Sequence, residues 1–293
     1  MKWLAVVLLV LSASGSAAQE SVESLHVPTD AKPGSIVRIS VDIPAGRDSV
    51  SSVTGSMSGE PLHFHQMTHG TWHAIGAISP DAKGNVAAIA MITYASGRTN
   101  NVAGSTRVSI PPQSHGKPPG LSVSTRFTQP MDSATEARIA RENATAREIG
   151  RASHDTPAMW SMAFRRPRDA VITSTFGSGR LFNGTLTSRH LGVDFRGKTG
   201  DPIVAANRGI VALVDNLFLA GNVVYIDHGA GIVTAYFHMS KPLVAKGDTV
   251  ERGQTIGLVG ATGRVTGPHL HWSARYGTLT VNPLDLVALG TSW

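Results

Sequence analysis

Four histidines and one aspartate between residues 190 and 271 have the types and spacing of a metal site. His190 and Asp194 stand four residues apart, and Gly192 between them favours a loop that runs into a strand with both side chains on one side. His269 and His271 are separated by one residue, so a strand places both on the same face. One compact β segment therefore carries a set of metal-donor side chains.

A catalytic zinc is held by three protein ligands and keeps one position open for water. The chain has no cysteine, so histidines and carboxylates must hold any transition metal. Two of the histidines with Asp194 would supply three donors, and the spacing alone leaves open which two. The other histidines would act as acid–base groups beside a water that the metal activates, and His238, at the end of a predicted strand, fits that role. The same donors would also bind other divalent ions.

The remaining histidines carry a weaker signal. His228 stands between Asp227 and Gly229, and we expect it to make a hydrogen bond that stabilises a turn. A further group lies near the acidic residue Glu60 and matches no ligand spacing. We expect a polar strand face there rather than a second metal site. The group consists of His63, His65, His69 and His73.

The first 18 residues have the pattern of a secretory signal peptide. A positive start at Lys2 precedes an apolar run over residues 3–11, and Ser16 and Ala18 place small residues at −3 and −1 of a cleavage site. The run is too short to span a bilayer, and no cysteine follows the site to carry a lipid anchor. We therefore expect export with no stable membrane insertion.

Residues 19–112 predict a small β-sandwich, immunoglobulin-like in type. Apolar and polar residues alternate over residues 35–43, and residues 71–75 and 86–94 give further strand candidates, with glycine turns between them. The 31 glycines and 16 prolines of the 293-residue chain suit such a turn-rich β protein.

Residues 113–163 predict a linker with one helix. A capping box at Ser133–Glu136 marks its start, and Gly150 marks its end. Its weakly apolar face suggests a surface helix that connects two domains. That face consists of Ala137, Ala140 and Ala144.

Residues 164–293 predict a second β domain with no substantial helix. Apolar, β-branched runs indicate the strands, and glycine turns separate them. The runs lie at residues 203–204, 209–214, 223–226, 233–237, 250 and 254–259. The fold class is therefore mainly β.

Within this domain, residues 174–283 resemble the lysostaphin-type (LytM-type) zinc metalloendopeptidases of peptidoglycan. The family's H-x-x-x-D motif matches His190 to Asp194, and its H-x-H motif matches His269 to His271. Blocks between the motifs match in the same order, and the resemblance covers under half of the chain. These blocks lie at residues 226–229, 236–240, 247–254 and 260–266.

The resemblance implies a role for each matched residue. His190, Asp194 and His271 would be the zinc ligands, and His238 and His269 the catalytic histidines. The set is complete, whereas some relatives have lost ligands and only activate other hydrolases. Phe237 and Met239, where relatives often have alanine and leucine, are apolar replacements.

The resemblance also implies an antiparallel two-layer β catalytic domain with an open groove for an extended peptide. We expect Arg264 near a substrate carboxylate and Thr266 in the floor of the groove, with the small residues Gly260, Thr262 and Gly263. The formal net charge of +6 favours anionic partners, and stem peptides of peptidoglycan carry free carboxylates.

The sequence therefore predicts a periplasmic zinc metalloendopeptidase that cuts D-Ala–diaminopimelate cross-links, with no nucleic-acid partner. One alternative is a secreted enzyme that cuts glycine-rich peptides. Another is a non-catalytic, wall-binding regulator of other murein hydrolases. Residues 246–254 also resemble the hairpin of biotinyl or lipoyl carriers, or a sugar-phosphotransferase domain. No modifiable lysine stands at a hairpin tip, and a signal peptide disagrees with a cytoplasmic phosphotransferase.

Overall fold

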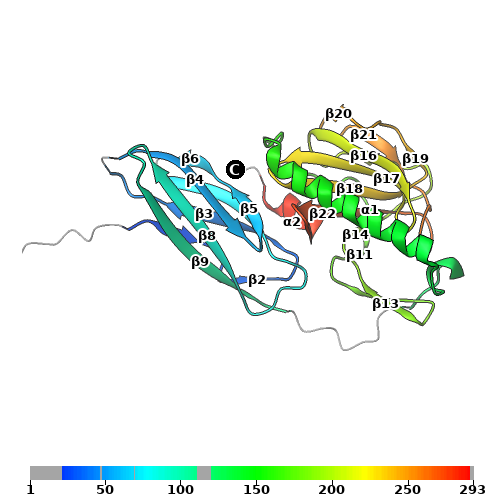
Figure 1. Cartoon of the computed structure of the whole chain (residues 1–293). Helices are drawn as coiled ribbons and strands as arrows, with labels where there is room; N and C mark the ends of the chain where they lie inside the picture. The colour runs from blue at the N-terminus through cyan, green and yellow to red at the C-terminus, as the bar shows by residue number, and fades with distance from the viewer. Residues whose placement is uncertain (1–21, 47, 69, 111–119, 291–293) are drawn as a thin grey trace, which may run out of the picture.

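The computed structural model describes residues 22–46, 48–68, 70–110 and 120–290. An N-terminal β region and a C-terminal β region lie side by side, and a long helix, α1, crosses the face of the second (Figure 1). The mainly β class is therefore confirmed. The predicted signal peptide and His69 lie outside the described residues. None of the described helices is long and apolar enough to cross a membrane.

Two sheets form the N-terminal region. Within each sheet the neighbouring strands are antiparallel, except for the parallel pair β2 and β9. In spatial order the first sheet consists of β1 (Ser24–His26), β3 (Ile36–Asp42), β7 (Thr71–Ala77) and β6 (His65–Thr68). The second consists of β2 (Asp30–Ala31), β9 (Thr99–Val108), β8 (Asn85–Tyr94), β4 (Val50–Met57) and β5 (Glu60–His63).

Alternating burial explains why these strands form a sandwich. Along β8 every second residue from Ala88 onward is buried, as expected when one face of a strand covers a core. Ile39 and Val41 of the first sheet meet Met57 and Ile92 of the second in one cluster. The strands predicted at 35–43, 71–75 and 86–94 are confirmed, whereas the polar strands β4 and β9 gave no clear signal in the sequence.

An eight-stranded antiparallel sheet dominates the C-terminal region. Its order is β11 (Ile172–Ser174), β14 (Val193–Arg196), β22 (His269–Tyr276), β18 (Ile232–Met239), β17 (Gly221–Gly229), β16 (Gly209–Leu217) and β20 (Thr249–Val250), with β23 (Leu279–Val281) on β22. A three-stranded sheet accompanies it: β15 (Pro202–Val204), β21 (Thr255–Leu258) and β19 (Lys241–Pro242). Another contains β10 (Gly120–Leu121), β12 (Gly179–Phe182) and β13 (Leu186–Arg189). The short helix α2 (Pro283–Ala288) follows.

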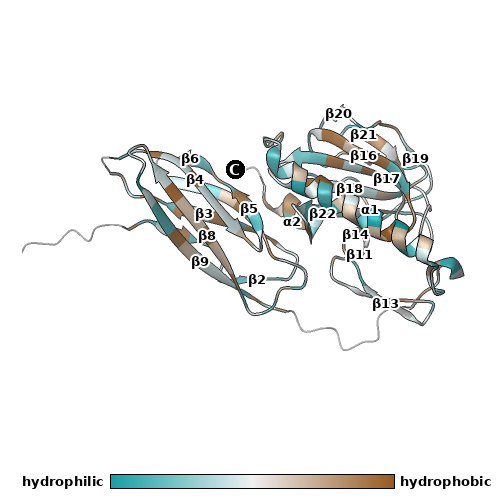
Figure 2. Ribbon diagram, viewed as in Figure 1, coloured by the Kyte–Doolittle hydropathy of each residue, from teal (hydrophilic) through white to brown (hydrophobic). Residues whose placement is uncertain are grey.

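Both faces of the large sheet are covered, because nearly every residue of β18 is buried. On one face lie the side chains of the main core, among them Tyr236 and Trp272. On the other face the helix α1 (Ser133–Ala152) packs against Val223 and Val233. Hydrophobic residues are accordingly concentrated in the strands, whereas α1 carries many hydrophilic residues (Figure 2).

The N-cap of helix α1 lies one residue earlier than expected. Asp132, not Ser133, is the N-cap, and its carboxylate accepts a hydrogen bond of 2.7 Å from the backbone N–H of Thr135. The predicted apolar face is also wrong. Its three alanines are exposed, and the helix instead packs through Ile149 and Ala146. The exposed residues are Ala137, Ala140 and Ala144.

Gly150 does not end the helix, which continues to Ala152 and into a 3₁₀ turn, Ser153–Asp155. A Cβ at position 150 would overlap the carbonyl oxygen of Gly277, in the turn between β22 and β23. Glycine is therefore required here by close packing of the helix on the sheet rather than by a helix stop.

The two β regions share apolar and polar contacts. Ile36, Ile75 and Ala77 of the first region belong to the main core of the second. The backbone N–H of Ile36 donates to the carboxylate of Asp285 at 3.0 Å. The two regions are therefore held together by a shared apolar core and hydrogen bonds, and not by the linker alone.

Glu60 is the buried charge of this interface. Its carboxylate accepts hydrogen bonds from the N–H of Thr278 at 2.9 Å, from the hydroxyl of the same residue, and from Nε2 of His154 at 3.0 Å. Burial alone would raise the pKa of Glu60, but these hydrogen bonds outweigh it and lower the pKa below its ordinary value.

We predict that Glu60→Gln lowers the free energy of unfolding by about 1–3 kcal/mol at pH 7, because a charge-assisted hydrogen-bond network is lost. Since the folded pKa is lowered, this stabilisation is fully present above pH 4.5, the ordinary value, and disappears as the pH falls further. Urea unfolding at several pH values measures the difference. Glu251→Gln, which removes an exposed ion pair with Arg208, is the control. An equal loss at all pH values would contradict the assignment.

Candidate metal centre

Strand register brings two of the predicted ligands together. Asp194 on β14 lies directly opposite His271 on β22, so both side chains stand on the same face of the sheet. His190 follows β13 and reaches the same point from the adjoining loop. The donor atoms are close: His271 Nδ1 to Asp194 Oδ1 is 2.9 Å, His190 Nε2 to Asp194 Oδ1 is 3.0 Å, and the two histidine nitrogens are 2.9 Å apart.

These three buried residues fit a tetrahedral metal ion. Bonds of about 2.0–2.1 Å in a tetrahedron place ligand atoms about 3.3 Å apart, slightly more than the distances seen here. Two nitrogens and one oxygen are a donor set that zinc accepts. Within the described ranges it is the one cluster of three such residues whose donor atoms lie this close.

Hydrogen bonds outside the centre fix the ring of His190. Its Nδ1–H donates to the carbonyl oxygen of Thr175 at 3.0 Å, with the hydroxyl of Ser174 also 3.0 Å away. Nδ1 therefore carries the proton, and the lone pair of Nε2 faces the centre. Such partners orient metal-binding imidazoles in proteins generally.

The charge states of the centre suit metal binding at neutral pH. Burial opposes ionisation of Asp194, but the close contacts of its carboxyl with the rings of His190 and His271 outweigh it and hold the pKa of the carboxyl well below its usual range. Burial lowers the pKa of His271 to about 4. An ionised carboxylate and a neutral imidazole are the forms that coordinate a metal ion.

Arg180 is a member of the site that the sequence analysis missed. It lies on β12, and its guanidinium donates to Oδ2 of Asp194 and, at 3.3 Å, to the hydroxyl of Ser174. Asp194 thus turns one oxygen toward the histidines and the other toward an arginine. Because Arg180 stands on a separate hairpin, no local spacing connected it with the motif.

Gly192 leaves room for a ligand. A Cβ at this position would lie 2.5 Å from two ring atoms of His271 and 2.7 Å from the carbonyl oxygen of Trp272. Neither group can move freely, because the first belongs to the metal centre and the second is buried backbone. The glycine between the first two predicted ligands therefore accommodates the third.

His238 enters the site through an unusual backbone conformation. On β18, Phe237 pairs with His271, so regular alternation would turn the next side chain to the opposite face. His238 instead has φ 62°, a left-handed conformation that strains a non-glycine residue. Hydrogen bonds hold it there: its N–H donates to Ala220 O at 2.9 Å, and its Nδ1–H donates to Thr262 O at 2.8 Å.

His269 stands beside it and is also held through Nδ1 by a backbone carbonyl. Its Nδ1–H donates to Gly267 O at 2.8 Å, and its Nε2 lies 3.7 Å from Oδ1 of Asp194. The rings of His238 and His269 are 5.0 Å apart. Burial, together with the neighbouring histidines, lowers the pKa of His238 well below its ordinary value, so this ring is neutral at pH 7. The ring of His238 therefore presents an unprotonated Nε2.

The structure places His228 away from this centre. It lies within β17 rather than in a turn, which corrects the expected location. Its ring is fully buried and bonded at both nitrogens, to Arg208 O at 2.7 Å and to the hydroxyl of Thr234 at 2.8 Å. It is a core histidine with its hydrogen bonds satisfied.

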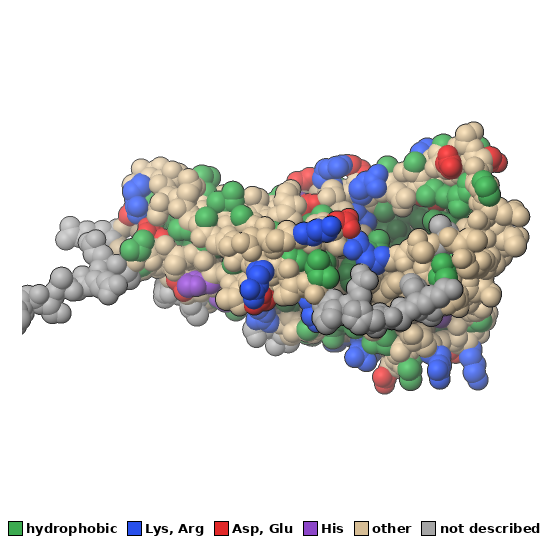
Figure 3. Space-filling model, turned by 90° about the horizontal axis from the view of Figure 1, so that it is seen from below, with side chains coloured by type: hydrophobic (Ala, Val, Ile, Leu, Met, Phe, Trp, Pro, Cys, Tyr) green, Lys and Arg blue, Asp and Glu red, His purple; other side chains and the backbone are tan. Residues whose placement is uncertain are grey.

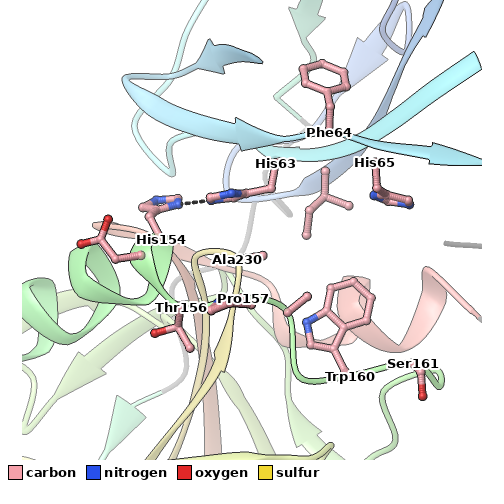
Figure 4. Close-up of a pocket in the computed structure, with 12 residues that line it drawn as sticks. His63, Phe64, His65, His154, Thr156, Pro157, Trp160, Ser161 and Ala230 are labelled. Carbon is pink, nitrogen blue, oxygen red and sulfur yellow. Dashed lines mark hydrogen bonds between the residues drawn. The ribbon is translucent and has the colours of Figure 1, made fainter. Parts of the chain in front are cut away.

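The N-terminal histidines do not form one cluster. His65 and His73 are paired across β6 and β7. His63 instead reaches the other region, where its Nε2 lies 2.8 Å from Nδ1 of His154, and both rings border a cavity of about 540 Å³ between the two regions (Figure 4). Trp160 lines the opposite side of this cavity. None of the residues at the metal centre lines it.

The predicted substrate residues lie on the loop between β21 and β22. Thr266 is exposed, and Arg264 is half-buried with its guanidinium 4.4 Å from the ring centre of Phe182. Thr262 serves the structure instead, because its hydroxyl donates to Met239 O at 2.9 Å. Seen from below, on the side where β13 lies in Figure 1, Lys and Arg side chains lie along one edge of a hollow in the C-terminal region (Figure 3).

Comparison with known proteins assigns this region to a family. The sequence profile of peptidase family M23 matches residues 188–283. This range includes the four site residues of the two motifs and also His238. A crystal structure from Pseudomonas aeruginosa that is assigned to peptidase M23 is similar over 89% of this chain and 95% of that chain, with a TM-score of 0.64 and 27% sequence identity. The likeness thus includes the N-terminal region.

Two sequence relatives are similar over the C-terminal part alone. Peptidoglycan DD-endopeptidase ShyA of Vibrio cholerae is 48% identical over 114 residues, 38% of this chain and 26% of that protein. DD-carboxypeptidase/endopeptidase Mpg of Neisseria meningitidis is 42% identical over 102 residues, 35% of this chain and 23% of that protein. This chain therefore matches about a quarter of the length of these relatives.

We predict that Gly192→Ala weakens metal binding at least about tenfold, because the added methyl group displaces the ring of His271. Competition with a zinc-sensitive dye measures the affinity without relying on activity. Gly46→Ala is the control, since a Cβ at that position meets no atom within 4 Å. Unchanged metal affinity in Gly192→Ala would show that the ring does not need this space.

Proposed function

The C-terminal segment of this chain belongs to peptidase family M23, the lysostaphin/LytM type, and we propose that the protein is a zinc metalloendopeptidase that hydrolyses peptide cross-links of peptidoglycan. One observation carries the proposal: a complete set of three donors with two further histidines, His238 and His269, beside it. A regulator without catalysis would not need that set. The name of the first sequence relative, a peptidoglycan DD-endopeptidase, supports the substrate class, and the name of the second supports the endopeptidase reaction.

The ligands in this proposal are Nε2 of His190, Oδ1 of Asp194 and Nδ1 of His271. Zinc suits two nitrogens and one oxygen, and three ligands leave a position for a water. When bound, the ion would polarise the scissile carbonyl and lower the pKa of that water. The role of Arg180 is to hold the second carboxylate oxygen, so that Asp194 presents one oxygen to the centre.

His238 and His269 are the proposed proton-transfer groups. Backbone carbonyls hold the Nδ1–H of each ring, so Nε2 is the atom that accepts a proton. One Nε2 takes a proton from the attacking water as the C–O bond forms. The protonated ring then donates to the amide nitrogen as the C–N bond breaks, while the other ring stabilises the charge on the carbonyl oxygen.

We assign the remaining parts of the chain to export and substrate approach. Residues 1–18 would be removed as a signal peptide, and the mature enzyme would act in the periplasm, where its substrate lies. Residues 19–112 would form one domain, 113–163 the linker and 164–293 the catalytic domain. The exposed Thr266 would contact the peptide, and the D-Ala–diaminopimelate bond would be cut.

We predict that the mature chain from Gln19 onward converts cross-linked muropeptide dimers to monomers. Purified peptidoglycan is incubated with the protein, and mass spectrometry of the fragments identifies the cut bond. A chelator should abolish the reaction, and added zinc should restore it. Cleavage that persists after the metal has been removed completely would refute the metalloenzyme assignment.

We predict that two histidine variants separate metal binding from proton transfer. His271→Ala should lose both the metal and activity, because a ligand is gone. His269→Ala should keep stoichiometric zinc but lose about 10²–10⁴-fold in kcat. Metal analysis and turnover are measured on the same preparations, with the exposed His26→Ala as the control. An active His269→Ala protein would refute its catalytic role.

A further inference from the structure

Arg264 is a half-buried cation without an anionic partner. Its guanidinium lies over the ring of Phe182, and its backbone N–H donates to Leu219 O at 2.8 Å. Among the described residues, no carboxylate forms an ion pair with this guanidinium, and no side-chain hydrogen bond reaches it. Burial and the charge of Arg180 both lower the pKa of Arg264, so the surroundings disfavour the positive charge.

The strand β12 connects this cation to the metal centre. Arg180 and Phe182 are two residues apart, so both side chains stand on one face of the strand. The first binds Asp194, and the second supports Arg264. The loop that carries Arg264 also holds a proposed catalytic group, because Thr262 O accepts the Nδ1–H of His238.

The balance of charge beside the centre is therefore positive. The guanidinium of Arg264 is close enough to that of Arg180 to interact with it electrostatically, and the carboxylate that Arg180 binds already faces two imidazoles. A divalent ion would add two further positive charges. A ligand anion at Arg264 would find a planar donor group whose orientation is already set by stacking on an aromatic ring.

Resting on the proposed function, we propose that Arg264 binds a free carboxylate of the stem peptide next to the scissile bond and makes the enzyme select unamidated cross-links. Guanidinium groups recognise carboxylates through two parallel hydrogen bonds. A carboxamide of the same shape has no negative charge and accepts through one oxygen only. The pairing would hold the peptide with its scissile carbonyl over the centre between His238 and His269.

The test compares two cross-linked muropeptide dimers that differ only in amidation of the carboxyl group beside the cut bond. We expect the wild-type protein to have a kcat/KM about 10–100-fold higher for the free acid, as expected for one charge-assisted pair. Arg264→Gln should lose this preference by weakening the free acid alone, chiefly through KM. Arg264→Lys should recover part of it, because the charge remains without the fork of donors.

Arg208→Gln is the charge-matched control, since it removes a surface arginine that pairs with Glu251. The wild-type preference needs no variant, so it tests the proposal even if Arg264→Gln does not fold. Equal cleavage of both dimers by the wild type would overturn the inference and leave the proposed function intact. Equal loss on both substrates in Arg264→Gln would also overturn it, as a structural role predicts. Cleavage of neither dimer would refute the proposed function itself.

Discussion

The division of the Asp194 carboxylate between two kinds of partner is the interaction on which the site depends. A buried carboxylate is costly unless donors surround it. Oδ2 accepts a hydrogen bond from Arg180, and Oδ1 faces the ring nitrogens of His190 and His271, with which it would hold the metal ion. The antiparallel register of β14 and β22, the hairpin of β12 and β13, and the space at Gly192 all serve to bring these groups around one negative charge.

The proposed acid–base groups are positioned in a different way, by the backbone. Carbonyl oxygens rather than charged side chains hold the rings of His238 and His269, which keeps their tautomers alike without adding charge to the site. The left-handed conformation of His238 interrupts the regular alternation of β18 one residue before the strand ends, so that a buried polar side chain turns toward the metal centre. Strain at one residue is thus compensated by hydrogen bonds from two neighbouring loops.

Local sequence patterns correctly predicted the features that depend on neighbouring residues in the chain. Period-two alternation predicted the apolar strands, and the H-x-x-x-D and H-x-H spacings located four of the five residues that the structure brings together. What failed depended on distant contacts. The requirement for glycine at 150 comes from Gly277, and Arg180 meets Asp194 through tertiary packing. The predicted apolar face of the helix was wrong because alanines occur on opposite faces of the helix and give almost no amphipathic signal. The packing depends instead on Ile149.

The core shared by the two β regions bears on how such proteins can be recombined. Ile36 and Ile75 pack into the same cluster as Leu286 and Leu289 at the end of the chain. A C-terminal region cut out of this protein would expose this apolar surface to water and would tend to self-associate. Grafting it onto a foreign amino-terminal module would require a replacement with complementary shape. The arrangement of the two β regions therefore depends on their shared core, and this core limits the exchange of either region for an unrelated domain.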